Sequence, residues 1–457
     1  MDGLVQSTAS TAAILDRLRS AIDLQDGDLA RALARQLLDE DAAELFEDLD
    51  RAEIRALAAL LGDETLADLL SQIDEHDAAD ILEQLPIEHA ADVLEEIDPD
   101  DAADIMFRVE PGMSEDILVA MQPADAAEIR ELMAYRPDTA GGIMTPEFVA
   151  MEPGLRADRA IAALRKVAEE AETINYVYIT DPEEHLLGVL SLHRLVLSRP
   201  DTIVAQLMYP DPVRVNVNDD QEDVARLLTE RHFLAIPVVD NENRLVGIVT
   251  ADDVADVLEE EATEDIERLG GSAPLSEPYL RASPVLLFRK RIVWLLVLFM
   301  AQFVTLEVYD HYEGVLREQL ILAMFVPILI GTGGNVGSQT VTTIIRAMAV
   351  GEAAPRHFLR ILGKEIATAA GLGLVMGTLM FARGAVSDGR EFGLTVGVTV
   401  GVLIMWAAIV GAMLPLILSK LRVDPAVVSA PFISSLVDAT GLIIYFTVAG
   451  FILHVNP

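Results

Sequence analysis

The chain contains no cysteine, and it has very few lysines beside many acidic residues. Without cysteine, disulfide bonds, thiolate metal sites and cysteine catalysis are excluded. A formal net charge of −41 argues against nucleic acid as a partner. Neither a Walker phosphate-binding loop nor a nucleophile constellation occurs, so we do not expect an enzyme. The start of the chain, from Met1, lacks the basic region and apolar run of a signal peptide, so we expect this part to stay in the cytoplasm.

Acidity and hydrophobicity are concentrated in different parts of the chain. Of 457 residues, 52% are apolar, and the mean hydropathy is +0.35 despite the strong negative charge. Residues 281–457 hold 13 basic and 10 acidic side chains, a net charge of +3, which leaves −44 for residues 1–280. The composition therefore indicates several domains, with an acidic soluble part joined to a nearly neutral apolar part.

The apolar part contains five stretches that are long enough to cross a bilayer, which takes about 20 apolar residues per helix. We expect spans at 291–308, 319–346, 360–383, 392–419 and 427–454. Nine basic residues would flank these spans on one side, namely Arg289, Lys290, Arg291, Arg346, Arg356, Arg360, Lys364, Lys420 and Arg422. Only Arg317, Arg383 and Arg390 would lie on the other. The positive-inside rule then predicts a multi-pass protein of the cell membrane, with cytoplasmic soluble domains and a C-terminus outside.

Asp438 is the sole acidic residue of the fifth span, and it lies near the middle of that span. An ionisable group in hydrocarbon is costly unless it faces water or an ion. The alternative is an Asp438 that is protonated or paired with Lys or Arg, but no basic residue lies at a matching depth in the other spans. The sequence therefore favours a cation site on a water-filled path.

The second span carries further polar groups. Pro327 precedes a glycine-rich stretch at 331–340, in which Asn335, Ser338 and Gln339 offer oxygens that can orient water. Four glycines within seven residues make a weak helix that neighbours can approach closely. In the fourth span, small residues at four-residue spacing indicate helix packing rather than ion chemistry: Gly393, Gly397 and Gly401.

From about residue 41 the soluble part repeats every twelve residues. Equivalent positions are Glu44, Ala56, Asp68, Asp80, Asp92, Asp104, Asp116 and Glu128, and each is followed by an aliphatic residue. Four copies are interrupted by proline, at Pro86, Pro99, Pro111 and Pro123. Short amphipathic helices joined by proline turns should stack into an all-α superhelical solenoid, with a plain helical bundle as the alternative.

Residues 143–262 contain a second, longer repeat. Ile-Met-Thr-Pro at 143–146 corresponds to Leu-Met-Tyr-Pro at 207–210, and the stretch 186–195 corresponds to 245–254. The shared pattern, Gly-apolar-apolar-Ser/Thr-x-x-Asp in its full form, resembles the CBS domain. That resemblance implies a tandem pair of α/β modules of βαββα order, which often bind adenine nucleotides.

The two copies differ at the position that would hold a nucleotide. In the second copy, Thr250 and Asp253 match the residues that hold the ribose in the CBS family. In the first copy Ser191 is present, but Arg194 replaces the Asp. The resemblance therefore implies an ATP site in the second copy at most.

The whole arrangement is similar to the MgtE family of magnesium transporters and channels, from about residue 30 to the end. The most specific motifs are Gly-Thr-Gly-Gly-Asn at 331–335 with Gln339, Asp-Pro-Ala at 424–426 and Asp-Ala-Thr-Gly-Leu at 438–442. The resemblance implies a homodimeric pore in which both protomers contribute Asp438. The other residues of the expected ion pathway are Ser434, Gly441, Asn335 and Gln339.

Magnesium as the ion comes from this resemblance, and it agrees with the chemistry of the spans. Mg²⁺ dehydrates reluctantly and keeps several waters, so one carboxylate per protomer suits a hydrated ion. A soft metal would need Cys, Met or His ligands, and the pore spans have no cysteine and no clustered histidines. The expected domains are a solenoid at 1–140, CBS copies at 141–205 and 206–262, a connecting helix at 263–290 and a five-helix pore domain at 291–457.

An acidic run follows the second CBS copy. On a helix, four of its carboxylates would share one face, with two more beside it. This run could be only a solvated acidic surface, but the resemblance implies regulatory Mg²⁺ bound with the loop at 424–426. The expected regulatory ligands are Asp253, Asp256, Glu260, Glu261, Glu264, Asp265, Asp424 and, in the solenoid, Asp98.

These expectations combine into a channel for Mg²⁺ influx that cytosolic Mg²⁺ closes. When cytosolic Mg²⁺ is scarce, the acidic domains would repel each other and stay apart. When it is abundant, Mg²⁺ ions would bridge these domains and pull the connecting helix over the pore. The alternatives are a proton-coupled exporter or exchanger of divalent cations such as Mg²⁺ and Co²⁺, in which Asp438 carries the proton, and halophilic solvation as the cause of the acidity.

Overall fold

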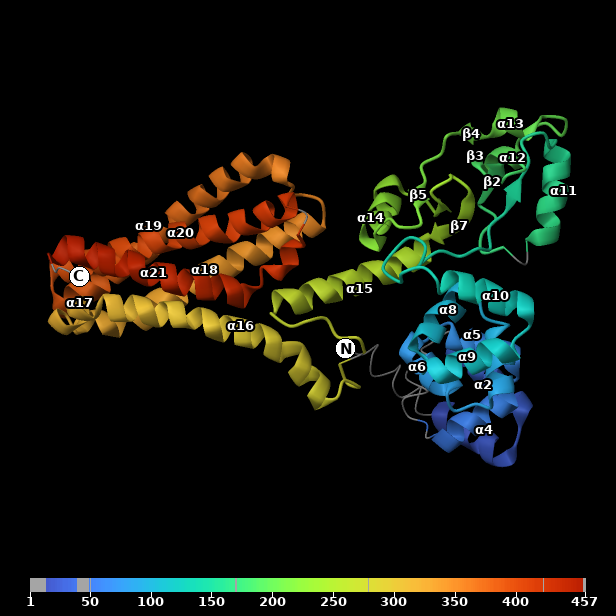
Figure 1. Ribbon diagram of the computed structural model, residues 1–457, viewed down its shortest axis with the longest axis horizontal. Coiled ribbons are helices and arrows are strands. Elements are labelled where there is room, and N and C mark those ends of the chain that lie inside the picture. Colours follow the sequence, from blue (N-terminus) through green and yellow to red (C-terminus); the bar gives the residue numbers. More distant parts are fainter. Residues whose placement is uncertain are drawn as a thin grey trace. The chain divides into compact units, whose positions relative to one another are not determined.

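The computed structural model describes residues 14–38, 49, 51–168, 171–277, 279–421 and 423–454. The chain divides into two compact units, Met1–Glu259 and Glu260–Pro457 (Figure 1). The first unit contains the solenoid and two small sheets, and the second contains five long apolar helices.

The front of the first unit consists of short helices that begin every twelve residues. After α2 (Gly27–Leu38) and α4 (Arg51–Leu61) come α5 (Asp63–Leu70), α6 (Glu75–Leu82), α7 (Ile87–Leu94), α8 (Pro99–Arg108), α9 (Pro111–Ala120) and α10 (Pro123–Leu132). Proline is the first residue of α8, α9 and α10, where its missing N–H has no partner to lose. The repeat at Glu44 lies outside the described residues.

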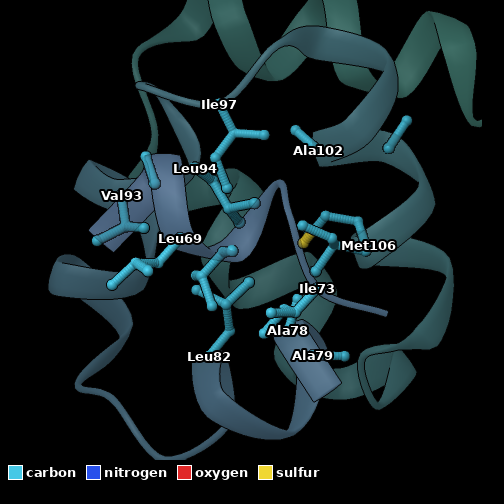
Figure 2. Close-up of a cluster of buried hydrophobic side chains, with 14 of the residues drawn as sticks. Leu69, Ile73, Ala78, Ala79, Leu82, Val93, Leu94, Ile97, Ala102 and Met106 are labelled. Atoms are coloured by element: carbon cyan, nitrogen blue, oxygen red, sulfur yellow. The ribbon is translucent and has the colours of Figure 1, made fainter. Parts of the chain in front are cut away.

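The solenoid core forms because each helix packs on the helix two positions further along the chain. These pairs are α5 with α7, α6 with α8, α7 with α9 and α8 with α10. Helices α5 to α8 and the turns between them bury apolar side chains in this core, as Figure 2 shows for Leu69, Ile73, Ala78, Ala79, Leu82, Val93, Leu94, Ile97, Ala102 and Met106. The predicted all-α stacking of twelve-residue repeats is confirmed.

Two sheets follow, each with its own helices. The first has the order β1-β2-β3-β4, from β1 (Ala150–Met151), β2 (Tyr176–Thr180), β3 (Leu186–Ser191) and β4 (Tyr209–Pro210), with α11 (Ala157–Val167), α12 (Leu192–Val196) and α13 (Val204–Leu207). The second has the order β5-β6-β7, from β5 (Val215–Asn216), β6 (Ala235–Val239) and β7 (Leu245–Thr250), with α14 (Gln221–Arg231). In both, a parallel pair precedes an antiparallel pair, which confirms the predicted βαββα order.

The second unit contains five helices that are long and apolar enough to cross a membrane, as predicted. These are α16 (Pro284–His311), α18 (Ile321–Ala349), α19 (Phe358–Asp388), which follows the short η1 (Pro355–His357), α20 (Arg390–Lys420) and α21 (Ala430–Leu453). Short segments α17 (Glu313–Glu318) and η2 (Pro425–Val427) lie between them. The glycine stripe of α20 serves packing, as expected, because a Cβ on Gly397 would lie 2.8 Å from the carbonyl oxygen of Gly377 on α19.

The connecting helix is shorter than we expected. Helix α15 (Ala251–Leu269) ends before Gly270, and a new helix, α16, begins at Pro284. Gly271 adopts φ +77°, a left-handed conformation that ends a helix at little cost for glycine. The prediction of a single helix over 263–290 is therefore wrong.

Candidate ion sites

Asp438 lies in the third turn of α21, a helix that begins at a well-formed cap. The Ser429 side chain accepts a hydrogen bond from the backbone N–H of Phe432, at 3.3 Å. Asp438 itself is half-buried, and the side-chain amide of Gln302 on α16 donates to its Oδ2 at 3.5 Å. Among the described residues, no Lys or Arg forms an ion pair with Asp438. The pairing alternative therefore finds no support in this structure.

Gln302 was not identified from the sequence. Its amide nitrogen also lies 3.4 Å from Ser435 Oγ, so it connects α16 to α21 at two points. An amide within an otherwise apolar stretch is a polar signal of the same kind that identified Asp438. The structure adds that the two polar residues, 136 positions apart, face each other.

The glycine-rich face of α18 packs directly against α21. A Cβ on Gly334 would lie 2.9 Å from Ser434 Oγ, and a Cβ on Gly337 would lie 2.6 Å from Ile433 Cγ2. Glycine at these positions lets the two helices approach closely. As a result Ser338 Oγ lies 3.4 Å from Ser434 Oγ, so two hydroxyls meet about one turn before Asp438.

The remaining expected pathway residues have different environments. Asn335 and Gln339 are both exposed on α18, four residues apart and so on one side of the helix. Gly441 is buried, and a Cβ there would lie 2.8 Å from Leu403 Cδ1, so its position is a packing contact with α20. Within one chain, the structure therefore brings Ser434 and Ser338 together and leaves the amides of α18 on the surface.

A second charged group lies where α15 meets the loop before α21. Arg268 forms ion pairs with Glu264 and, at 2.6 Å, with Asp424. Burial, followed by the charges of Asp424 and Glu261, raises the pKa of Asp265 to about 6. Two carboxylates therefore pair with Arg268 here, and Asp265 and Glu261 lie close enough to Asp424 and to each other for their charges to interact.

A third group of carboxylates lies within the first unit, and most of it was missed from the sequence. Burial, followed by the charges of Asp253 and Asp101, raises the pKa of Asp100 well above its usual range. Burial and Asp98 raise the pKa of Asp101 to about 6. Burial, then Asp98 and Asp253, raise the pKa of Glu172 to about 7. The structure thus places Asp98, the candidate from the sequence, among half-buried carboxylates from α8, the β1–β2 connection and the start of α15.

One atom in this group has no protein partner. Asp100 Oδ1 is buried, and within the described part of the chain no donor reaches it. An unpartnered buried carboxylate oxygen is costly, and a cation would satisfy it. The charges that surround this atom are those of other carboxylates, the ligand type that a hard divalent ion such as Mg²⁺ prefers.

The acidic residues of α15 fall into two groups along the helix. Asp253 belongs to the group in the first unit, whereas Glu264 pairs with Arg268 near Asp424. Eleven residues of helix separate Asp253 from Glu264, a rise of roughly 16 Å, which one ion cannot bridge. Burial and the neighbouring charge of Glu259 raise the pKa of Asp256, which lies between the two groups. Helix α15 therefore contributes its acidic residues to two separate clusters.

The expected nucleotide residues of the second CBS copy contact each other. The Thr250 hydroxyl and backbone N–H donate to Asp253 Oδ2, at 2.7 and 3.1 Å. In the first copy, the Arg194 guanidinium lies 4.5 Å above the ring of Tyr209, a cation–π contact. Arg194 thus takes part in a packing contact with Tyr209.

Comparison with known proteins gives matches in the solenoid, in the second CBS copy and in the apolar C-terminal part of the chain. Family models match "MgtE intracellular N domain" at 38–138, "CBS domain" at 204–260 and "Divalent cation transporter" at 326–448. A magnesium transporter MgtE of Thermus thermophilus is 44% identical over 328 residues, 72% of this chain and 73% of that protein. One from Enterococcus faecalis is 38% identical over 325 residues, covering 70% and 71%.

A solved structure supports the same assignment for the soluble part. The crystal structure of the soluble part of a magnesium transporter has 35% sequence identity and a TM-score of 0.51. It matches 55% of this chain and 99% of the solved one.

Proposed function

Because this chain belongs to the MgtE family of magnesium transporters, we propose that it conducts Mg²⁺ into the cell down its electrochemical gradient. The observation that carries the proposal is Asp438, a carboxylate within a membrane span whose contact is the neutral amide of Gln302. A carboxylate that has no cationic partner among the described residues attracts a cation, and the amide fixes its orientation. The ion remains hydrated, because one carboxylate per chain is too few for a dry octahedral site.

The pore forms between two copies of the chain. Asn335 and Gln339 support this proposal, because both amides are exposed on the glycine-rich helix α18. Exposed amides in a membrane span need polar partners, which a second copy across a two-fold axis supplies. Because the chain has no cysteine, Asn335→Cys gives a single reactive thiol. Disulfide cross-linking of this variant into a dimer is expected, and a chain that remains monomeric under oxidation contradicts the shared pore.

The ion site is tested by flux into liposomes with a panel of divalent cations. Asp438→Ala is expected to abolish Mg²⁺ uptake while the folded protein remains intact, and Asp438→Asn separates the effect of charge from that of shape. Asp388→Asn, which removes an exposed carboxylate at the end of α19, is the matched control. Uptake by both Asp438 variants at the wild-type rate would remove this residue from the pathway. Uptake that persists without a proton gradient distinguishes a channel from a proton-coupled exchanger.

Cytosolic Mg²⁺ closes the pore by binding the two acidic clusters. The support is electrostatic, because each cluster holds carboxylates whose mutual repulsion a divalent ion relieves. One ion at ten times its dissociation constant shifts an equilibrium by about 1.4 kcal/mol. A change from 1:99 to 99:1 takes about 5.5 kcal/mol. About four linked ions are therefore needed, and two clusters in each of two protomers provide that number.

To test this gating, we would measure the internal Mg²⁺ concentration at which the flux falls to half of its maximum. Asp265→Asn is expected to raise that concentration, because it removes one carboxylate from the cluster beside Asp424. Asp116→Asn, at an exposed position of the solenoid, is the control. If internal Mg²⁺ does not reduce flux through the wild-type protein, gating of this kind is excluded while the ion site at Asp438 still stands.

The second CBS copy binds an adenine nucleotide through Thr250 and Asp253. Both side chains are already aligned by their mutual hydrogen bonds, and a ribose would replace the Thr250 hydroxyl as the partner of Asp253. Since Asp253 also contributes to the acidic cluster, ATP and Mg²⁺ must alter each other's affinity by the same factor. Isothermal titration calorimetry with ATP, with and without Mg²⁺, tests this proposal. A Thr250→Val variant that binds ATP with the same heat as the wild-type protein would contradict it.

A further inference from the structure

Arg268 lies one residue before the end of α15 and pairs with two carboxylates. Its Nη1 lies 2.6 Å from Asp424 Oδ2, and it also pairs with Glu264, one turn earlier on the same helix. Glu261 and Asp265 belong to the same cluster, since the charge of Glu261 and that of Asp424 raise the pKa of Asp265. All of these residues lie within the second unit.

Both carboxylate oxygens of Asp424 already accept a hydrogen bond. Its Oδ1 accepts the backbone N–H of Ala426 at 2.8 Å, where Asp424 caps the short helix η2. Its Oδ2 accepts from Arg268. A cation that binds Asp424 at Oδ2 therefore meets the guanidinium, and it must displace Arg268 or share that oxygen with it.

We propose that Arg268 is an internal counter-cation that competes with the regulatory metal ion for Asp424 and so sets the Mg²⁺ concentration at which the pore closes. The proposal rests on the proposed function, in which Mg²⁺ at this cluster closes the pore. Without metal, the guanidinium neutralises part of the cluster. With metal, a hard divalent ion takes the carboxylate oxygens, and Arg268 retains Glu264 as its partner.

The contacts around Arg268 show that this end of α15 does not depend on the ion pair alone. Leu269 packs on the apolar core of the second unit. A Cβ on Gly271 would lie 2.8 Å from Trp294 Cδ1, and the Trp294 indole N–H donates to Ser429 Oγ at 2.9 Å. Because the helix end remains docked through these contacts, neutralising Arg268 changes mainly the charge that a metal ion meets.

This proposal predicts a direction that a simple structural tether does not. In the full-length protein, Arg268→Gln is expected to lower the internal Mg²⁺ concentration for half-closure about threefold to tenfold, where tenfold corresponds to about 1.4 kcal/mol. Flux in the absence of internal Mg²⁺ should stay unchanged. Arg268→Lys, which retains the charge, should restore most of the wild-type value. Arg289→Gln removes an exposed arginine of the same unit and is the matched control.

The outcomes separate competition from tethering. If Arg268 served only to hold α15 on the Asp424 loop, Arg268→Gln would raise the Mg²⁺ concentration for half-closure. A rise, or no change, overturns the proposal.

A second measurement keeps the test independent of gating. Hydrogen exchange of residues 260–275 in the full-length protein gives the Mg²⁺ concentration at which α15 becomes protected. We expect this concentration to fall with Arg268→Gln. If internal Mg²⁺ does not reduce wild-type flux, but Arg268→Gln lowers the Mg²⁺ concentration that protects α15, the gating proposal fails and the competition stands. If flux closes normally and protection does not shift, the competition fails alone.

Discussion

Asp101→Asn in the full-length chain tests the electrostatics of the acidic cluster in the first unit. Asp101 lies in the first turn of α8, where burial and then the charge of Asp98 raise its pKa from 3.8 to about 6, against a hydrogen bond with Ser71 that lowers it. Asparagine has nearly the same shape and keeps an oxygen for Ser71, but it carries no charge. The substitution therefore removes repulsion and leaves packing in place.

The sign follows from the raised pKa. The folded state binds the proton of Asp101 more tightly than the unfolded state does. The contribution of Asp101 to the free energy of unfolding therefore falls as pH rises from about 4 to 6, and it is constant above that range. A shift of two units corresponds to a ceiling of about 2.7 kcal/mol, and the partial exposure of Asp101 reduces this to about 1 kcal/mol. We expect Asp101→Asn to stabilise the metal-free protein by that amount at pH 7.5, and by about half as much at pH 5.

The assay is thermal unfolding of the detergent-solubilised protein, followed by circular dichroism in EDTA and in Mg²⁺. For a unit of this size, about 1 kcal/mol raises the melting temperature by roughly 2–4 °C. Mg²⁺ should stabilise the wild-type protein more than the variant, because the ion has lost one ligand. Asp92→Asn, at an exposed position of α7, is the control. A variant that melts at or below the wild-type temperature in EDTA would refute the reasoning.

Three further changes test other parts of the structure. Gly337→Ala would place a methyl group 2.6 Å from buried Ile433 and should destabilise the second unit by about 1–3 kcal/mol. Tryptophan fluorescence reports the melting of this unit, since both tryptophans lie in it. The control is Gly331→Ala, where nothing lies within 4 Å of the added methyl group, and equal melting temperatures of the two variants would contradict the prediction. Gln302→Leu should lower Mg²⁺ flux about threefold, because the pore carboxylate loses a long hydrogen bond; wild-type flux would show that the amide is dispensable. Lowering the internal pH from about 7.5 to 5.5 should weaken closure by Mg²⁺, because protons compete with the ion for Asp265, whose pKa is about 6. Closure that does not change with pH would exclude this competition.

Properties that depend on neighbouring residues could be predicted from the sequence. The twelve-residue repeat, the βαββα order and the five spans all follow from local periodicity, turn residues and hydropathy. The isolation of Asp438 was equally visible, because a single carboxylate in an apolar span is a local feature. The end of α15 was not predicted, although Gly270 and Gly271 were a signal for it.

The members of the acidic clusters could be predicted only in part. The acidic run of α15 was evident, but its division between two clusters depends on what each end of the helix contacts. Asp100 and Asp101 on α8 meet Glu172 and Asp253 only after the solenoid has packed against the CBS pair within the first unit. No periodicity in the sequence encodes that approach.

The sequence by itself determined which segments are helical, which cross the membrane and which carboxylate is isolated there. The tertiary structure alone decided that Gln302 faces Asp438, 136 residues away, and that Arg268 holds Asp424, 156 residues away. The physical reason is that helix formation and membrane insertion depend on a window of about 20 residues. Pairing of charges depends instead on which helix faces pack together, and close packing selects those faces through contacts distributed along the whole chain.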